Sequence, residues 1–145
     1  MCVLRVSANR KTLSDFLSET RFPFCTEYDK GTMAMFGRDK GKPHRRAGFN
    51  TLVSRKQWDD LPGQVTDAIR FLRRNRHHLN RLRSEFKARD VRLDFPYYLR
   101  IGKNDIVIQC DFLPATLISL AGELGIGIEM TLYPGGRSSR RQTNR

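Results

Sequence analysis

The sequence predicts a single α+β domain in which a mostly antiparallel sheet is covered on one face by three helices. Two observations support this class. Short segments alternate apolar and polar residues, as strands with one buried face do, and longer segments repeat apolar residues every three or four positions, as amphipathic helices do. The chain of 145 residues is 39% hydrophobic, enough for one core without disulfide or metal support. We place the domain at residues 1–134 and expect the basic tail at 135–145 to be disordered.

The first third of the chain predicts strands around one helix. Residues 2–8 alternate and predict a strand, and Asn9 is suited to cap the helix that follows. Residues 22–24 alternate two phenylalanines through a proline, which is typical of an edge strand. Further strands are expected at 33–36 and 49–54, with a basic, glycine-containing loop between them.

A long helix is expected over residues 61–87. Asp60 suits its N-terminal dipole, and Pro62 suits its first turn. Apolar residues then recur at the spacing of one buried stripe, which comprises Val65, Ile69, Leu72, Leu79 and Phe86. This helix would be the longest element of the fold.

The last third predicts two strands, a helix and a final strand. Residues 91–99 and 106–112 both alternate, and the segment 102–105 between them has the composition of a hairpin turn. Residues 114–125 begin with a proline and end with a glycine, as a short capped helix does. Residues 126–132 alternate again and predict the last strand.

An internal repeat relates the two ends of the chain. A shift of 104 positions aligns the first helix with the last, and each copy has the order strand, helix, strand, glycine. The aligned pairs are Thr12–Leu13 with Thr116–Leu117, Glu19 with Glu123, Phe22 and Phe24 with Ile126 and Ile128, and Gly31 with Gly135. Split βαβ units give an antiparallel sheet with helices on one face, the ferredoxin-like arrangement. We therefore predict ferredoxin-like, pseudo-duplicated βαβ units.

Positive charge is concentrated in three segments. The formal net charge is +12, from 27 lysines and arginines against 15 aspartates and glutamates. Residues 65–89 carry +6, residues 37–46 carry +4 and residues 137–145 carry +4, so the rest of the chain carries −2. A localised basic surface attracts nucleic acid, anionic lipid or an acidic protein. The alternative explanation is solubility, or a GC-rich genome that places arginine wherever a surface tolerates it.

Seven arginines lie within residues 70–89. At about 100° per residue, some fall on the core-facing side of the helix and others on the opposite face. The inward residues need carboxylate partners, because an unpaired buried charge is too costly. These candidate structural ion pairs comprise Arg76, Arg83, Asp94, Asp111 and Glu129. The outward residues form the candidate anion-binding surface, which comprises Arg70, Arg73, Arg74 and Arg81.

No motif predicts a catalytic residue, a metal site or a cofactor. Cys2, Cys25 and Cys110 are far apart in the sequence, which argues against a disulfide framework or a zinc site. His77 and His78 are adjacent, so on a helix they point about 100° apart and cannot share one metal. The basic loop lacks the glycine spacing and the Ser or Thr of a phosphate loop. No apolar run is long enough for a signal peptide or a membrane span, so we expect a cytoplasmic protein.

Several short structural motifs occur in a defined order over residues 2–134. The motifs are Gly48–Phe49, Val53–Ser54, Trp58 before the long helix, Phe112–Leu113–Pro114, Leu117, Leu120–Ala121, Gly125 and Leu132–Tyr133. In this order they resemble a family of small bacterial α+β proteins of unknown function. The resemblance implies a cytoplasmic bacterial protein with no established reaction, and it transfers no catalytic residue.

We therefore expect a non-enzymatic binding module whose partner is unknown. One hypothesis is a protein partner, or a second copy of this chain, docked on the sheet or on one of its edge strands. Another is polyanion binding, to RNA or DNA, through the outward arginines, with an affinity that falls steeply as salt rises. A residual hypothesis is an enzyme that uses the strand carboxylates as acid and base.

Overall fold

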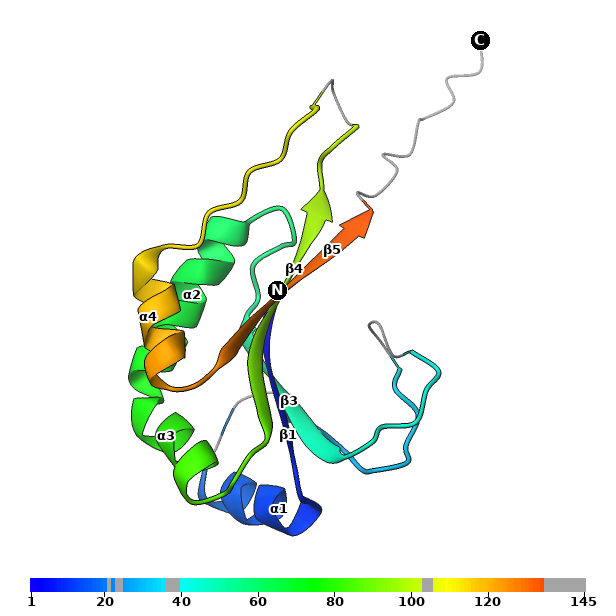
Figure 1. Cartoon of the computed structure of the whole chain (residues 1–145), viewed down its shortest axis with the longest axis vertical. Helices are drawn as coiled ribbons and strands as arrows, with labels where there is room; N and C mark the ends of the chain where they lie inside the picture. The colour runs from blue at the N-terminus through cyan, green and yellow to red at the C-terminus, as the bar shows by residue number, and fades with distance from the viewer. Residues whose placement is uncertain (21, 23–24, 36–39, 103–105, 135–145) are drawn as a thin grey trace.

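The structure is a computed structural model that describes residues 1–20, 22, 25–35, 40–102 and 106–134. Over these residues the chain forms an α+β fold with five strands and four helices (Figure 1). In chain order the elements are β1 (Cys2–Ala8), α1 (Arg10–Glu19), β2 (Cys25–Tyr28), β3 (Ala47–Ser54), α2 (Leu61–Arg74), α3 (Arg76–Ser84), β4 (Asp90–Leu99), α4 (Ala115–Glu123) and β5 (Gly127–Pro134). The predicted α+β class is confirmed, and the predicted tail lies outside the described residues.

The sheet is mixed, with the strand order β2-β3-β1-β4-β5. The pairs β2–β3, β3–β1 and β1–β4 are antiparallel, whereas β4 and β5 are parallel. All four helices lie on one side of this sheet, and the chain between β2 and β3 curls back on the other side (Figure 1). The strand predicted at 126–132 is β5, and it forms one edge of the sheet.

The predicted repeat is wrong in its second copy. The first four strands have the order βαββαβ, in which β3 separates β1 from β2 and β1 separates β3 from β4, as in two split βαβ units. The second unit uses α2 and α3, not the helix that the 104-residue shift proposed. Residues 106–112 form no strand, because both edges of β4 are already occupied, by β1 and by β5. An alternating segment needs a free edge as well as the right pattern.

The predicted long helix over 61–87 is two helices that meet at Asn75. Its start is as expected, since Asp60 accepts a hydrogen bond from the backbone N–H of Gly63 at 2.9 Å. At the break, both the backbone N–H and the side-chain amide of Asn75 donate to the carbonyl of Phe71, at 3.0 and 2.9 Å. A side chain that competes for a helical carbonyl in this way ends the helix. The apolar stripe nevertheless continues across the break, since Leu72 and Leu79 are both buried.

The core lies between the sheet and the helices. Phe16 of α1 is fully buried and contacts Phe22, Phe49 and Phe86 with ring centroids 5.1 to 6.0 Å apart. Phe22 therefore packs in the core, and β2 begins only at Cys25, whereas residues 23–24 lie outside the described part. The strand expected at 33–36 is reduced to a single bridge from Met33, with Phe36 outside the described part.

None of the helices within the described residues is both long and apolar enough to cross a lipid bilayer.

Candidate functional site

The face of the sheet that points away from the helices carries charged side chains. Alternate residues of a strand point to opposite faces, so Leu4 and Val6 of β1 enter the core while Arg5 points away from it. This open face lines a hollow of about 320 Å³, which we call the sheet cavity. Its polar lining includes Arg5, Ser7, Asn50, Arg92, Asp94 and Glu129.

Asp94 is the most enclosed charge of the sheet cavity, with only 5% of its side chain exposed. Arg5 donates to one of its oxygens through Nε at 2.9 Å and through Nη2 at 2.5 Å. The hydroxyl of Thr131 donates to the other oxygen at 2.6 Å. This network joins β1, β4 and β5, so it fixes the relative positions of three strands.

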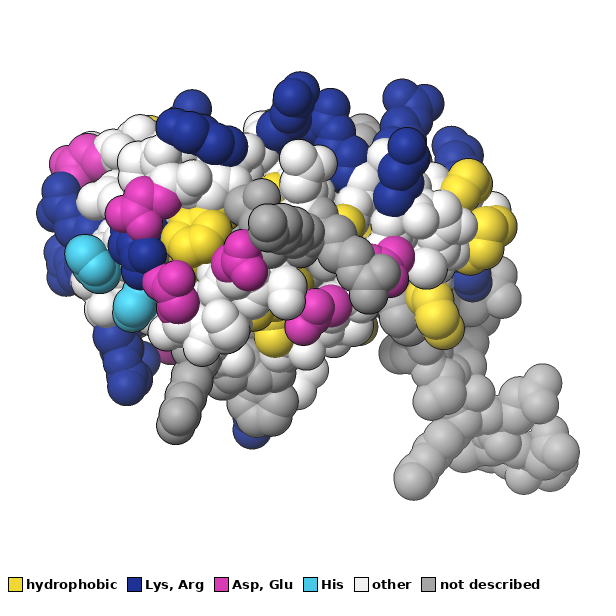
Figure 2. All heavy atoms as spheres, turned by 90° about the horizontal axis from the view of Figure 1, so that it is seen from below, with side chains coloured by type: hydrophobic (Ala, Val, Ile, Leu, Met, Phe, Trp, Pro, Cys, Tyr) yellow, Lys and Arg dark blue, Asp and Glu magenta, His cyan; other side chains and the backbone are white. Residues whose placement is uncertain are grey.

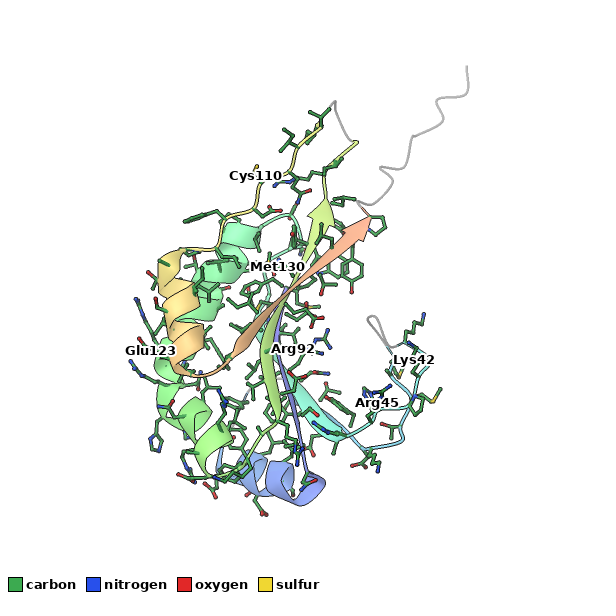
Figure 3. All side chains as sticks on the ribbon, in the orientation of Figure 1. Lys42, Arg45, Arg92, Cys110, Glu123 and Met130 are labelled. Atoms are coloured by element: carbon green, nitrogen blue, oxygen red, sulfur yellow. The ribbon has the colours of Figure 1, made fainter. Side chains whose placement is uncertain are left out.

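Arg92 lies beside Arg5 in the sheet register and is neutralised by two carboxylates. Its Nη1 is 3.0 Å from an oxygen of Asp90, and its Nε is 2.8 Å from an oxygen of Glu129. The second contact is an ion pair but not a hydrogen bond, because the buried Nε–H is not aligned with the carboxylate. Figure 3 shows Arg92 extending from β4 toward the side of the sheet on which Lys42 and Arg45 lie.

The predicted structural ion pairs form with other partners. Asp94 and Glu129 are neighbours across β4 and β5, as alternating strands allow, but arginines of the sheet neutralise them. Asp111 lies elsewhere and pairs with Arg100 at 2.9 Å. An acid–base role for these carboxylates would require them to leave their arginines.

The inward orientation predicted for two helix arginines is wrong. Arg76 is 57% exposed and pairs with Glu123 of α4 at 2.7 Å. Arg83 is exposed and donates to the carbonyl of Gly125 at 3.3 Å. The buried residues of α3 are Leu79 and Leu82, so both arginines lie at the edge of the buried stripe, where a long side chain reaches solvent.

The four outward arginines have different surroundings. Arg70 is exposed and pairs with Asp67 at 3.1 Å. Arg81 is only 24% exposed, lies between Glu19 and Glu85 and covers the ring of Phe86. The hydrogen bonds that Arg81 donates to Glu85 and then to Glu19 raise the pKa of Arg81. The charge of Arg81 is therefore already neutralised by carboxylates of the protein itself.

Only two of the four arginines of the predicted anion-binding surface lack an ion-pair partner among the described residues. Arg73 and Arg74 are exposed and have no ion-pair partner in the part of the chain that the structure describes.

A second hollow, of about 660 Å³, lies at the end of the sheet where β1 ends and β3 and β4 begin. We call it the basic groove. Its charged lining residues are the five cations Lys30, Arg45, Arg46, Lys87 and Arg89 and the carboxylate Asp29. Lys30, Arg45, Arg46 and Arg89 take part in no ion pair among the described residues. Figure 2 shows lysine and arginine side chains gathered along the upper rim of this end of the molecule.

The fold holds the basic groove together through short backbone connections. Lys87 has a positive φ of 50°, which turns the chain after α3, and its amine donates to the carbonyl of Ser84 at 2.6 Å. The backbone N–H of Arg89 then donates to the carbonyl of Ser7 at 3.0 Å. Helix α1 begins at the same groove, and its cap residue Asn9 makes no side-chain capping hydrogen bond. The positive end of a helix adds to the attraction for anions.

An aromatic pair lies where the sheet cavity approaches the basic groove. Tyr28 of β2 lies over Gly48 of β3, where a methyl group would come within 2.1 Å of the phenol oxygen. The phenol donates to the carbonyl of Val6 at 3.4 Å, and burial raises the pKa of Tyr28. His44 stacks on this ring with centroids 4.0 Å apart. Glycine therefore permits the packing of an aromatic wall against the sheet.

The charge of +4 over residues 37–46 is evident from the sequence, but the charge alone assigns none of these residues to a site. The signal that could have located the basic groove is the proximity of this segment to the end of the first strand. That proximity follows only from the strand order.

No group of three or more His, Cys, Asp or Glu side chains within the described ranges could hold a metal ion. Comparison of the chain with protein-family models, with curated proteins and with solved structures gave no match. The resemblance drawn from the sequence motifs therefore stays an expectation.

Proposed function

We propose that this protein is a polyanion-binding module that holds the phosphate backbone of a nucleic acid in the basic groove. The observation that carries this proposal is that, among the described residues, five cations and a single carboxylate line one hollow. Guanidinium groups bind phosphate through paired hydrogen bonds, and lysine adds a mobile point charge. Four of these cations make no ion pair among the described residues, whereas Arg70 and Arg81 of the α2–α3 face are paired with carboxylates. This difference favours the groove as the principal site.

The charge of the two hollows supports phosphate binding in the groove alone. The basic groove has five cations against one carboxylate, a net of +4. The sheet cavity has two arginines against three carboxylates, a net of −1. A phosphate is therefore attracted to the end of the sheet and repelled from its open face.

The test is the salt dependence of binding to fluorescein-labelled single-stranded RNA and DNA, measured by fluorescence anisotropy. For a single strand, log K falls with log salt at a slope of about −0.7 for each phosphate neutralised, so five contacts predict a slope of about −3.5. A fourfold rise in salt should weaken the wild type roughly 100-fold, and a double variant that lacks two contacts only roughly 20-fold. The double variant is Arg45→Ala with Arg46→Ala.

A matched control removes the same charge from another surface. Arg73→Ala with Arg74→Ala removes two exposed arginines of α2 that have no ion pair among the described residues. We expect this variant to keep the wild-type slope. If the slope of log K against log salt becomes shallower in the control variant and stays unchanged in the groove variant, the α2 face is the site. Failure of single- and double-stranded nucleic acid to bind at low salt would remove the proposal altogether.

A protein-binding role is the second candidate, favoured by an exposed apolar region near α4. Val107, Ile108 and Phe112 are 81%, 72% and 80% exposed. Residues 107–112 make no backbone hydrogen bond within the described part of the chain, although their composition suits a strand. Such a segment can add to a strand of a protein partner or of a second copy. Self-association measured by sedimentation should then be lost in Val107→Ser with Phe112→Ser, and high salt should leave it intact.

A further inference from the structure

The sheet cavity contains polar groups that the fold does not use. The side chains of Ser7 and Asn50 line the cavity and make no hydrogen bond within the described residues. Asn50 lies on β3, level with Arg5 of β1 on one side and Thr26 of the edge strand β2 on the other, and it lines the cavity on the open face. A carboxamide offers a donor and an acceptor side by side, which matches the edge of a nucleobase.

The charges of the cavity favour a neutral ligand. Both arginines are already neutralised, Arg5 by Asp94 and Arg92 by Asp90 and Glu129. An anion would meet the net negative charge of the cavity, whereas a flat polar heterocycle adds no charge. The stacked pair of Tyr28 and His44 supplies an aromatic wall for such a ring, and base–aromatic stacking is tolerant of sequence.

The sheet cavity and the basic groove are adjacent along four separate stretches of the chain. In each stretch one residue lines the cavity and a residue directly adjacent to it in sequence lines the groove. These pairs are Ser7 and Ala8, Tyr28 and Asp29, His44 and Arg45, and Asp90 and Arg89. Consecutive Cα atoms are about 3.8 Å apart, so the two hollows meet at the same end of the sheet, although successive strand residues such as Ser7 and Ala8 point to its opposite faces.

We propose that the sheet cavity takes one unpaired nucleobase of a single strand whose phosphates lie in the basic groove. The inference rests on the proposed function and names its ligand class: single-stranded rather than double-stranded nucleic acid. The cavity volume of about 320 Å³ is at the lower end for ligand pockets, which suits one base with its sugar. A base within a duplex is stacked and paired, so it cannot enter without being unstacked.

The test compares two labelled DNA single strands of equal length and charge, one with bases and one abasic throughout. The wild type should bind the base-bearing strand about tenfold more tightly, since stacking and edge contacts are lost with the bases. Asn50→Ala should reduce this ratio by roughly threefold and leave the affinity for the abasic strand unchanged. Asn80→Ala, an exposed asparagine of α3, is the matched control and should keep the full ratio.

The outcomes separate this inference from the proposed function. Equal affinity of the wild type for both strands overturns the base-binding inference and leaves phosphate binding intact. An equal loss of both affinities in Asn50→Ala also overturns it, because the amide would then act on the fold or on the backbone. If neither strand binds at low salt, the proposed function itself is wrong.

Discussion

Replacing Asp94 with alanine should destabilise the fold by about 2–3 kcal/mol. The carboxylate is 5% exposed and accepts from Arg5 through two nitrogens and from Thr131. Removing one partner of a buried ion pair costs about 3–5 kcal/mol, because the remaining charge is left uncompensated. Here the Arg5 side chain is 30% exposed and faces a cavity, so water can solvate the charge that Asp94→Ala leaves unpaired. The expected cost is therefore about 2–3 kcal/mol, below the usual range for a fully buried pair.

The assay is urea unfolding followed by circular dichroism at neutral pH, with the slope against urea checked for constancy. A double-mutant cycle isolates the ion pair: Arg5→Met removes the stranded charge, so the double variant should be more stable than the sum of the singles by about 1.5 kcal/mol. The matched control is Glu123→Ala, which breaks a pair with both partners more than half exposed. Its cost should stay within about 0.5 kcal/mol. Equal costs for Asp94→Ala and Glu123→Ala, or a coupling energy near zero, would refute the reasoning.

The remaining predictions concern the aromatic wall and the thiols. Gly48→Ala should lower the stability by more than about 2 kcal/mol, because the new methyl group would come within 2.4 Å of the backbone oxygen of Val6, and the loss should appear in the urea midpoint. Burial raises the pKa of Cys25 to about 11, so its contribution to stability is full below the unfolded value near 9 and falls as pH rises between these values. The free energy of unfolding should therefore fall less steeply with pH across this window in Cys25→Ser than in the wild type. At neutral pH iodoacetamide should modify the exposed Cys110 before Cys25, as mass spectrometry of digests would show, and the reverse order would contradict the burial of Cys25.

Elements whose pattern and boundaries are both local could be predicted from the sequence. β1 covers residues 2–8 because alternation continues up to Asn9, where the helix begins. The start of α2 follows from Asp60 and Pro62 in the same way. The break at Asn75 could not be found by periodicity, since the apolar stripe continues across it and the competing hydrogen bond to Phe71 is visible only in three dimensions. The strand predicted at 106–112 is wrong for the opposite reason. The local composition suits a strand, but no edge of β4 is free to pair with it.

The location of the candidate site required the tertiary pairing of charges. Counting placed the largest single share of net charge, +6, in residues 65–89, yet Arg81 is neutralised by Glu19 of α1 and Arg76 by Glu123 of α4. Both carboxylates come from elements distant in sequence, so no local pattern reveals these two pairs, although the spacing of Arg81 and Glu85 does indicate a second partner for Arg81. The groove residues Arg45 and Arg89, by contrast, become neighbours only because β3 and β4 flank β1 and both begin where it ends. Composition therefore predicts that a basic surface exists, whereas the strand order decides which cations remain free for an anionic ligand.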